Sequence, residues 1–146
     1  MKKHIGLNFN FKLIGTDKKT GKKIESPIFN NVVDTGLDAV ADLIAGEFTY
    51  LAIGTGTTAV TTGDTELETE YTRESVSFTD EGTGIRQVDH TFNVGSGVSE
   101  DITEVGLFNS ATPSGSTMLN RAVDSAFTLD SDNPLRVIGT ITVTTS

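Results

Sequence analysis

The chain has 146 residues, of which 36% are hydrophobic and none is cysteine. This length favours one domain, spanning residues 1–146, with a core large enough to fold without disulfides or bound metal. The lack of cysteine excludes disulfides and thiolate metal sites but leaves the redox compartment undecided. The net charge of −9 opposes nucleic-acid binding, and no apolar run approaches the roughly 18 residues that cross a bilayer.

Charge is divided unevenly along the chain. Residues 1–23 hold every lysine and one acid, for a net charge of +6, whereas residues 24–146 hold four arginines and nineteen acids, for a net charge of −15. The basic segment either docks on the acidic body of a neighbouring copy, which favours a ring or another repetitive assembly, or forms a solvated hairpin tip that guards a strand edge. The candidate partner-contact residues are its lysines: Lys2, Lys3, Lys12, Lys18, Lys19, Lys22 and Lys23.

The N-terminal residues, 1 to about 28, are predicted to form this basic hairpin. Hydrophobic residues alternate from Ile5 to Leu13, which indicates a half-buried strand and not a signal peptide. Asp17–Gly21 has the composition of a turn, in which Gly21 can adopt a positive φ. The return strand, about residues 22–29, carries Pro27, which suits a sheet edge. Phe9 and Phe11 alone do not provide the aromatic platform that single-stranded nucleic acid needs.

Residues 35–45 are predicted to form the one helix. Leu37, Val40, Ala41 and Ile44 are spaced so that they share one face, which should lie against a sheet. Asp34 or Thr35 can cap its start, and Gly46 is expected to end it.

Strand patterns fill most of the remaining chain. They lie at about residues 48–54, 70–79, 86–94, 102–109, 117–127 and 135–143, separated by turns rich in glycine, serine, threonine and aspartate. Seven or eight short strands predict a mainly β protein, an antiparallel β-sandwich or jelly-roll-like barrel with one short helix.

The stretch from Asp101 to Val123, DITEVGLFNSATPSGSTMLNRAV, has the pattern of two strands joined by a polar turn. Val105 and Leu107 alternate before the turn, and the same period resumes after it. Glu104 and Arg121, on neighbouring strands, are predicted to form a cross-strand pair that serves stability.

This stretch also resembles a segment of small structural proteins of tailed bacteriophages. The resemblance rests on ITEVGLFN and TMLNRAV, on NVVDTGL from Asn31, on LAIGTGTT from Leu51, and on LETE with Arg73; the final strand fits loosely, with glycine where an aromatic residue is common. The matches spread over roughly residues 30–145. The motif residues that carry the resemblance are Ile102, Glu104, Val105, Gly106, Leu107, Phe108 and Arg121.

The resemblance implies a virion component, made in the host cytoplasm, that acts as a capsid decoration protein or as a part of the tail, baseplate or fibre. Its expected partners are other copies of itself, in a ring or trimer-type assembly, and other virion proteins, with neither nucleic acid nor membrane. The alternative is a carbohydrate- or host-surface-binding β-sandwich module. Two tyrosines and no tryptophan argue against it, because sugars usually stack on such rings.

Several patterns superficially suggest sites for chemistry. Gly54-Thr55-Gly56 lacks the lysine and further glycines of a phosphate cradle, so a tight turn is favoured. The acids spaced by two, Asp64, Glu66, Glu68 and Glu70, would gather calcium only on a strand face, and hydrated loop residues are favoured. Asp130, Asp132 and Asn133 suit a turn that bonds its own backbone better than a calcium loop.

Histidine chemistry has little support either. His4 is placed in the N-terminal segment, and His90 lies among apolar residues, where a hydrogen-bonded histidine at the edge of the core is favoured. No serine stands in a Gly-x-Ser-x-Gly elbow, although a triad built from distant residues leaves no such local signal. We therefore expect no enzymatic activity, no catalytic residue, no metal and no cofactor.

Overall fold

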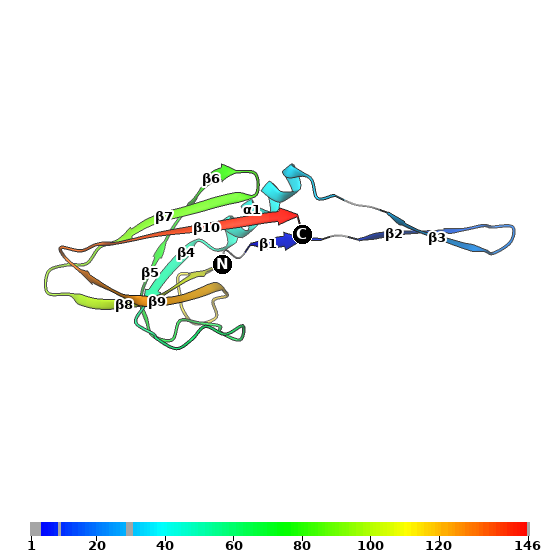
Figure 1. The fold of residues 1–146 in the computed structure, drawn as a ribbon. Coiled ribbons are helices and arrows are strands. Elements are labelled where there is room, and N and C mark those ends of the chain that lie inside the picture. The colour runs from blue at the N-terminus through cyan, green and yellow to red at the C-terminus, as the bar shows by residue number, and fades with distance from the viewer. Residues whose placement is uncertain (1–3, 9, 29–30, 146) are drawn as a thin grey trace.

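The computed structural model of the protein describes residues 4–8, 10–28 and 31–145. In these residues two four-stranded sheets face each other, one helix lies at one end of the space between them, and a two-stranded hairpin projects from that end (Figure 1). The predicted fold class is confirmed as a mainly β, sandwich-like fold with one short helix. Both sheets keep open edges, so the described strands do not close into a barrel.

The first sheet has the order β1-β10-β7-β6. Its strands are β1 (Ile5–Leu7), β6 (Phe78–Gly82), β7 (Ile85–Phe92) and β10 (Leu135–Thr145). Pairing is antiparallel except between β1 and β10, which run parallel. The expected antiparallel arrangement therefore holds throughout the described strands of this sheet except at the short edge strand β1.

The second sheet has the order β5-β4-β8-β9 and is antiparallel throughout. Its strands are β4 (Tyr50–Gly54), β5 (Glu70–Ser75), β8 (Ser99–Phe108) and β9 (Met118–Asp130). The predicted single strand over residues 70–79 is instead divided between β5 and β6, which belong to different sheets. Val76 lies buried at the crossing, where its N–H donates to the carbonyl of Thr49. The alternating side-chain pattern over residues 70–79 continues through this crossing, because β5 and β6 both turn one side toward the space between the sheets. The sequence pattern therefore resembles that of a single strand.

The main core lies between the two sheets. It joins Leu51, Ile53 and Leu107 of the second sheet to Val88 and Phe92 of the first. A smaller cluster of Ala52, Leu67 and Phe108 lies on the opposite face of the second sheet. The loop over residues 55–69 covers that face, so β4 and β8 are buried on both sides.

The helix α1 (Asp34–Glu47) extends the predicted range of 35–45 by a few residues. Its predicted apolar face is confirmed, since Leu37 and Ala41 pack on Ile141 and Val143 of β10. The predicted caps are wrong: Val33 occupies the N-cap position without a side-chain hydrogen bond, and the helix runs through Gly46. Tertiary packing on β10 and β7 holds the helix in place of a side-chain cap.

The projecting hairpin, which we call the arm, consists of β2 (Phe11–Thr16) and β3 (Lys23–Ile28). Its turn is confirmed, with Gly21 at a φ of 70° and its N–H donating to the Asp17 carbonyl at 2.7 Å. The predicted single half-buried strand from Ile5 to Leu13 is wrong. β1 joins the body, whereas β2 pairs only with β3 and is exposed along its whole length. Alternation showed that one face is apolar, but it could not show whether anything covers that face.

Candidate functional site

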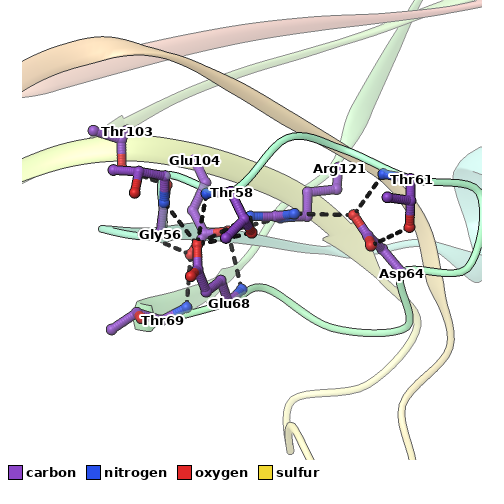
Figure 2. A network of polar contacts seen from close by, with 10 residues as sticks. Gly56, Thr58, Thr61, Asp64, Glu68, Thr69, Thr103, Glu104 and Arg121 are labelled. Carbon is purple, nitrogen blue, oxygen red and sulfur yellow. Dashed lines mark hydrogen bonds and ion pairs between the residues drawn. The ribbon is translucent and has the colours of Figure 1, made fainter.

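The Glu104 carboxylate is the centre of a polar network on the outer face of the second sheet (Figure 2). Glu104 lies on β8 with 1% of the residue exposed. Its oxygens accept hydrogen bonds from the N–H groups of Gly56, Glu68 and Thr69 at 3.0, 3.0 and 2.8 Å. All three donors belong to the loop over residues 55–69. One carboxylate therefore fastens both ends of this loop to the sheet.

Glycine is required where the loop meets this carboxylate. A Cβ at Gly56 would lie 2.5 Å from the Glu104 Oε1 atom, and a Cβ at Gly54 would lie 2.4 Å from the Thr69 carbonyl. The Gly54-Thr55-Gly56 stretch, whose glycines superficially suggest a phosphate cradle, thus brings the loop backbone close to the protein's own Glu104 carboxylate. Its role is in the fold.

Arg121 of β9 confirms the predicted pair with Glu104 and extends it. The Nε atom donates to Glu104 at 2.8 Å, and the Nη1 atom donates to Asp64 at 2.9 Å. Glu68 lies 3.7 Å from the same guanidinium, whose side chain is 3% exposed. The prediction of an ordinary cross-strand pair missed the loop acids, because they reach β9 only in the tertiary structure.

These contacts keep the network ionised. Burial is the strongest influence on Glu104 and by itself raises its pKa, but the hydrogen bonds from Thr69, Arg121, Glu68 and Gly56 together hold that pKa below its ordinary value. The pKa of Asp64 is lowered chiefly by the Thr61 hydroxyl and then by Arg121. A carboxylate held this firmly in its charged form is suited to structure and not to proton transfer.

Most acids of the run Asp64, Glu66, Glu68 and Glu70 form ion pairs with arginines. Asp64 and Glu68 face Arg121, and Glu70 forms a two-bond pair with Arg73 at 2.9 and 2.7 Å. Among the described residues no group of three or more His, Asp or Glu side chains is arranged to hold a metal ion. Asp64, Glu66 and Glu68 lie in the loop, as expected, and Glu70 begins β5; three of the four acids are bound to the fold and are not simply hydrated.

Two other weighed patterns take the structural form expected of them. Asp130 accepts hydrogen bonds from the backbone of Asp132 and Asn133 at 2.8 and 2.9 Å, which makes the predicted turn. His90 lies 2.8 Å from Glu74 and meets the edge of Phe92, as a histidine at the margin of the core should. His4 is exposed in the N-terminal segment.

The remaining motif residues support the fold. Ile102, Val105 and Leu107 face the main core, and Phe108 lies in the outer cluster. Gly106 allows β9 to approach, since a Cβ there would lie 2.8 Å from the Asn120 carbonyl. These residues are brought together on β8 and β9, and Ile102 and Val105 also border one of the hollows described below.

The arm is the stronger candidate for contact with a partner. Phe11, Leu13, Ile14 and Ile24 are 59–61% exposed. Lys12 pairs with Glu25 at 2.5 Å, whereas the four lysines near the tip make no ion pair with any described residue; these are Lys18, Lys19, Lys22 and Lys23. Lys2, Lys3 and Phe9 lie outside the described residues.

The two faces of the arm differ. By register, Leu13 lies opposite Ser26 and Gly15 lies opposite Ile24, so Phe11, Leu13 and Ile24 share one face. Lys12, Ile14 and Thr16 share the other face, with Lys23 and Glu25. The arm therefore has one face without charge, and in the described residues nothing covers it.

The open side of the sandwich has two hollows between β9 and β10. The proximal hollow, near the base of the arm, measures about 620 Å³ and is lined by Ile5, Val60, Leu119 and Ile141 among others. The distal hollow measures about 170 Å³ and lies between β8, β9 and β10. Sequence reasoning missed both, since no local pattern reports a gap between two sheets.

Comparisons with family models, with curated proteins and with solved structures give no match for this chain. The described residues contain no helix that is both long enough and apolar enough to span a membrane.

Proposed function

We propose that this protein is a structural component of a tailed-phage virion, which assembles in many symmetric copies through protein–protein contacts made by its arm. The observation that carries the proposal is the arm itself, a paired two-stranded hairpin that stands clear of the body (Figure 1). Its apolar face is exposed. Isolated hairpins of this kind are marginally stable in water. A partner that covers the apolar face of the arm would therefore stabilise the hairpin.

Burial energetics support assembly through this surface. Full burial of a leucine, isoleucine or phenylalanine side chain contributes about 1.5–3 kcal/mol. Phe11, Leu13 and Ile24 on one face therefore offer several kcal/mol to an interface. In a repetitive particle even modest contacts of this kind add through multivalency.

Charge supports a partner that is another copy. The arm over residues 11–28 holds five lysines and two acids, for a net charge of +3, whereas residues 31–145 hold four arginines and eighteen acids, for −14. A basic arm and an acidic body attract one another between copies, which speeds encounter and orients the contact. The buried carboxylate network is compatible with the same role, because its hydrogen bonds and ion pairs hold the loop over residues 55–69 on the body.

Placement in a virion rests on the sequence resemblance to tailed-phage structural proteins. Both a capsid decoration protein and a tail, baseplate or fibre component agree with an arm that links copies. Cryo-electron microscopy of purified particles that contain this protein would decide the position, because copy number and symmetry would be visible directly.

Self-assembly is tested by excising the arm. Residues 11–28 are replaced with a four-residue Gly-Ser linker, which spares β1 and keeps its pairing with β10. Light scattering after size exclusion should show oligomers for the full chain and monomers for the variant, and circular dichroism should show that the variant keeps its sheet. Oligomers of unchanged size without the arm would refute the proposal.

A further inference from the structure

The distal hollow has the shape and lining of a receptor for an apolar side chain. Ile102, Val105, Val123, Phe127, Leu135 and Val137 line it. Phe127 is among the large apolar residues that remain exposed. An apolar cavity of about 150 Å³ accommodates one benzene ring, so a hollow of about 170 Å³ has room for a single phenyl group.

Two strand edges beside this hollow have no strand partner in the described residues. β9 is the last strand of its sheet, and β10 pairs with β1 only over Val143–Thr145. The edge of β10 next to Leu135 and Val137 is therefore unpaired. Such edges are ready to receive another chain.

One acid without an ion-pair partner among the described residues lines the hollow, and four more lie on the neighbouring parts of β8 and of the turn after β9. Asp124 lines it, and Glu100 and Asp101 lie close by at the start of β8, where Asp101 is paired with Thr128 of β9. The turn that leads from β9 to β10 adds Asp130 and Asp132. None of these five acids forms an ion pair with a described residue. The arm has the opposite charge, and its four tip lysines also lack ion-pair partners among the described residues.

Geometry favours a second copy over the chain's own arm. The arm leaves the body beside Val143–Thr145 and points away from it (Figure 1). The hollow lies next to Leu135 and Val137, which at the rise of a strand is about 20–30 Å back along β10 in the other direction. A copy placed head-to-tail presents its arm to this end without any change in either fold.

We infer that the apolar face of the arm docks in the distal hollow of a neighbouring copy, with Phe11 occupying the hollow and the turn lysines Lys18 and Lys19 lying toward the acids beside it. The inference rests on the proposed self-assembly and names the receptor surface. The contact joins two different surfaces, so repetition closes into a ring or extends into a filament.

The test uses the absence of cysteine from the chain. Two single variants are prepared, Leu13→Cys on the apolar face of the arm and Ser125→Cys at the rim of the hollow. They are mixed and treated with a short bis-maleimide. Because each chain carries one thiol, a link between the two variants can form only between copies. We expect a Leu13→Cys–Ser125→Cys dimer, located by mass spectrometry.

The matched control replaces Ser125→Cys with Ile138→Cys. Ile138 is 53% exposed on the opposite face of β10 from Val137, and we expect little linking there. Linking at Ile138 in place of Ser125, in protein that still oligomerises, would overturn the inferred receptor and leave self-assembly standing. Protein that stays monomeric by light scattering would overturn both.

A second pair of variants separates the two faces of the arm. Phe11→Ala should weaken association roughly tenfold or more, because an aromatic anchor is lost from its pocket. Ile14→Ala removes an equally exposed side chain from the other face and should leave association nearly unchanged. Equal effects of the two variants would overturn the inference. A double variant, Leu13→Cys with Ser125→Cys, that links only within monomers would also overturn it, because the arm would then dock on its own body.

Discussion

The body and the arm of this protein handle charge in opposite ways. All four arginines lie in the body, and each is bound to at least one carboxylate: Arg73 to Glu70, Arg86 to Asp38, Asp42 and Asp80, Arg121 to Glu104, Asp64 and Glu68, and Arg136 to Asp89. All seven lysines lie in the first 23 residues, and among the described ones only Lys12 is paired.

Side-chain chemistry explains this division. The planar guanidinium of arginine donates in fixed directions and bridges several oxygens at once, so it suits buried junctions between elements. Lysine is a strongly hydrated point charge that stays in water and attracts acidic surfaces at a distance. The body therefore uses its arginines to hold its fold, whereas most lysines of the arm have no ion-pair partner among the described residues, as the proposed assembly through the arm requires.

The largest effect on the body should come from Glu104→Ala. Removing the carboxylate leaves three loop N–H groups and the buried Nε atom of Arg121 without their acceptor, which should lower the free energy of unfolding by about 3–5 kcal/mol. Urea denaturation measures this loss, and limited proteolysis should show new cleavage in residues 55–69. Glu66→Ala is the control, because Glu66 is exposed and makes no hydrogen bond or ion pair with the described residues. Similar losses in the two variants would contradict a special role for Glu104.

Exchanging arginine and lysine should change the free energy of unfolding in the body but not in the arm. Arg121→Lys keeps the charge but loses the fork that joins Glu104 to Asp64, and we expect the free energy of unfolding to fall by about 1–3 kcal/mol. Lys18→Arg in the arm should leave it unchanged. Thermal or urea unfolding of both variants provides the measurement. If Arg121→Lys were as stable as the original protein, charge alone would explain the network.

Acid should weaken the body through the same network. The pKa of Glu104 is held below its ordinary value of 4.5, so its ionisation stabilises the fold above that pH, and the stabilisation is lost as pH falls through the lower folded value. The free energy of unfolding, measured in urea at a series of pH values from 7 to about 3, should fall less steeply in Glu104→Gln. Parallel curves for the two proteins would show that Glu104 does not contribute to acid unfolding.

The smallest effect on stability is expected from the ion pair of the arm. Lys12 and Glu25 are both half exposed, so Lys12→Ala should change the free energy of unfolding by only about 0–0.5 kcal/mol. Its association, followed by light scattering at low and high salt, should nevertheless become less sensitive to salt, because charge that acts between copies is screened over about 10 Å at 0.1 M. A large loss of stability would show that Lys12 stabilises the fold, as the arginines of the body do.

Local patterns were sufficient for much of the fold. The spacing of Leu37, Val40, Ala41 and Ile44 predicted the buried face of α1, because a helix repeats every 3.6 residues wherever it is placed. Alternation predicted most strands of the body, and the Asp17–Gly21 turn followed from its residue types. The pairing of Glu104 with Arg121 also followed from the hairpin that brings β8 and β9 together.

Other features depended on contacts between distant residues. The strand predicted over residues 70–79 divides between two sheets because Val76 passes through the core, and no local signal marks such a crossing. The sequence pattern around Asp64 and Glu68 indicates hydrated loop residues. In the folded protein both lie beside Arg121, which is more than fifty residues away in the sequence.

The sequence by itself determined that this chain is mainly β, that it carries one amphipathic helix, and that its positive charge gathers at the N-terminus. These are properties of residue type and short-range period. Only the tertiary structure decided that the arm stands clear of the body, that Glu104 fastens the loop over residues 55–69, and that an apolar hollow opens between β9 and β10. The physical reason is that exposure, burial and the meeting of two surfaces depend on what the rest of the chain covers, which no single stretch of sequence records.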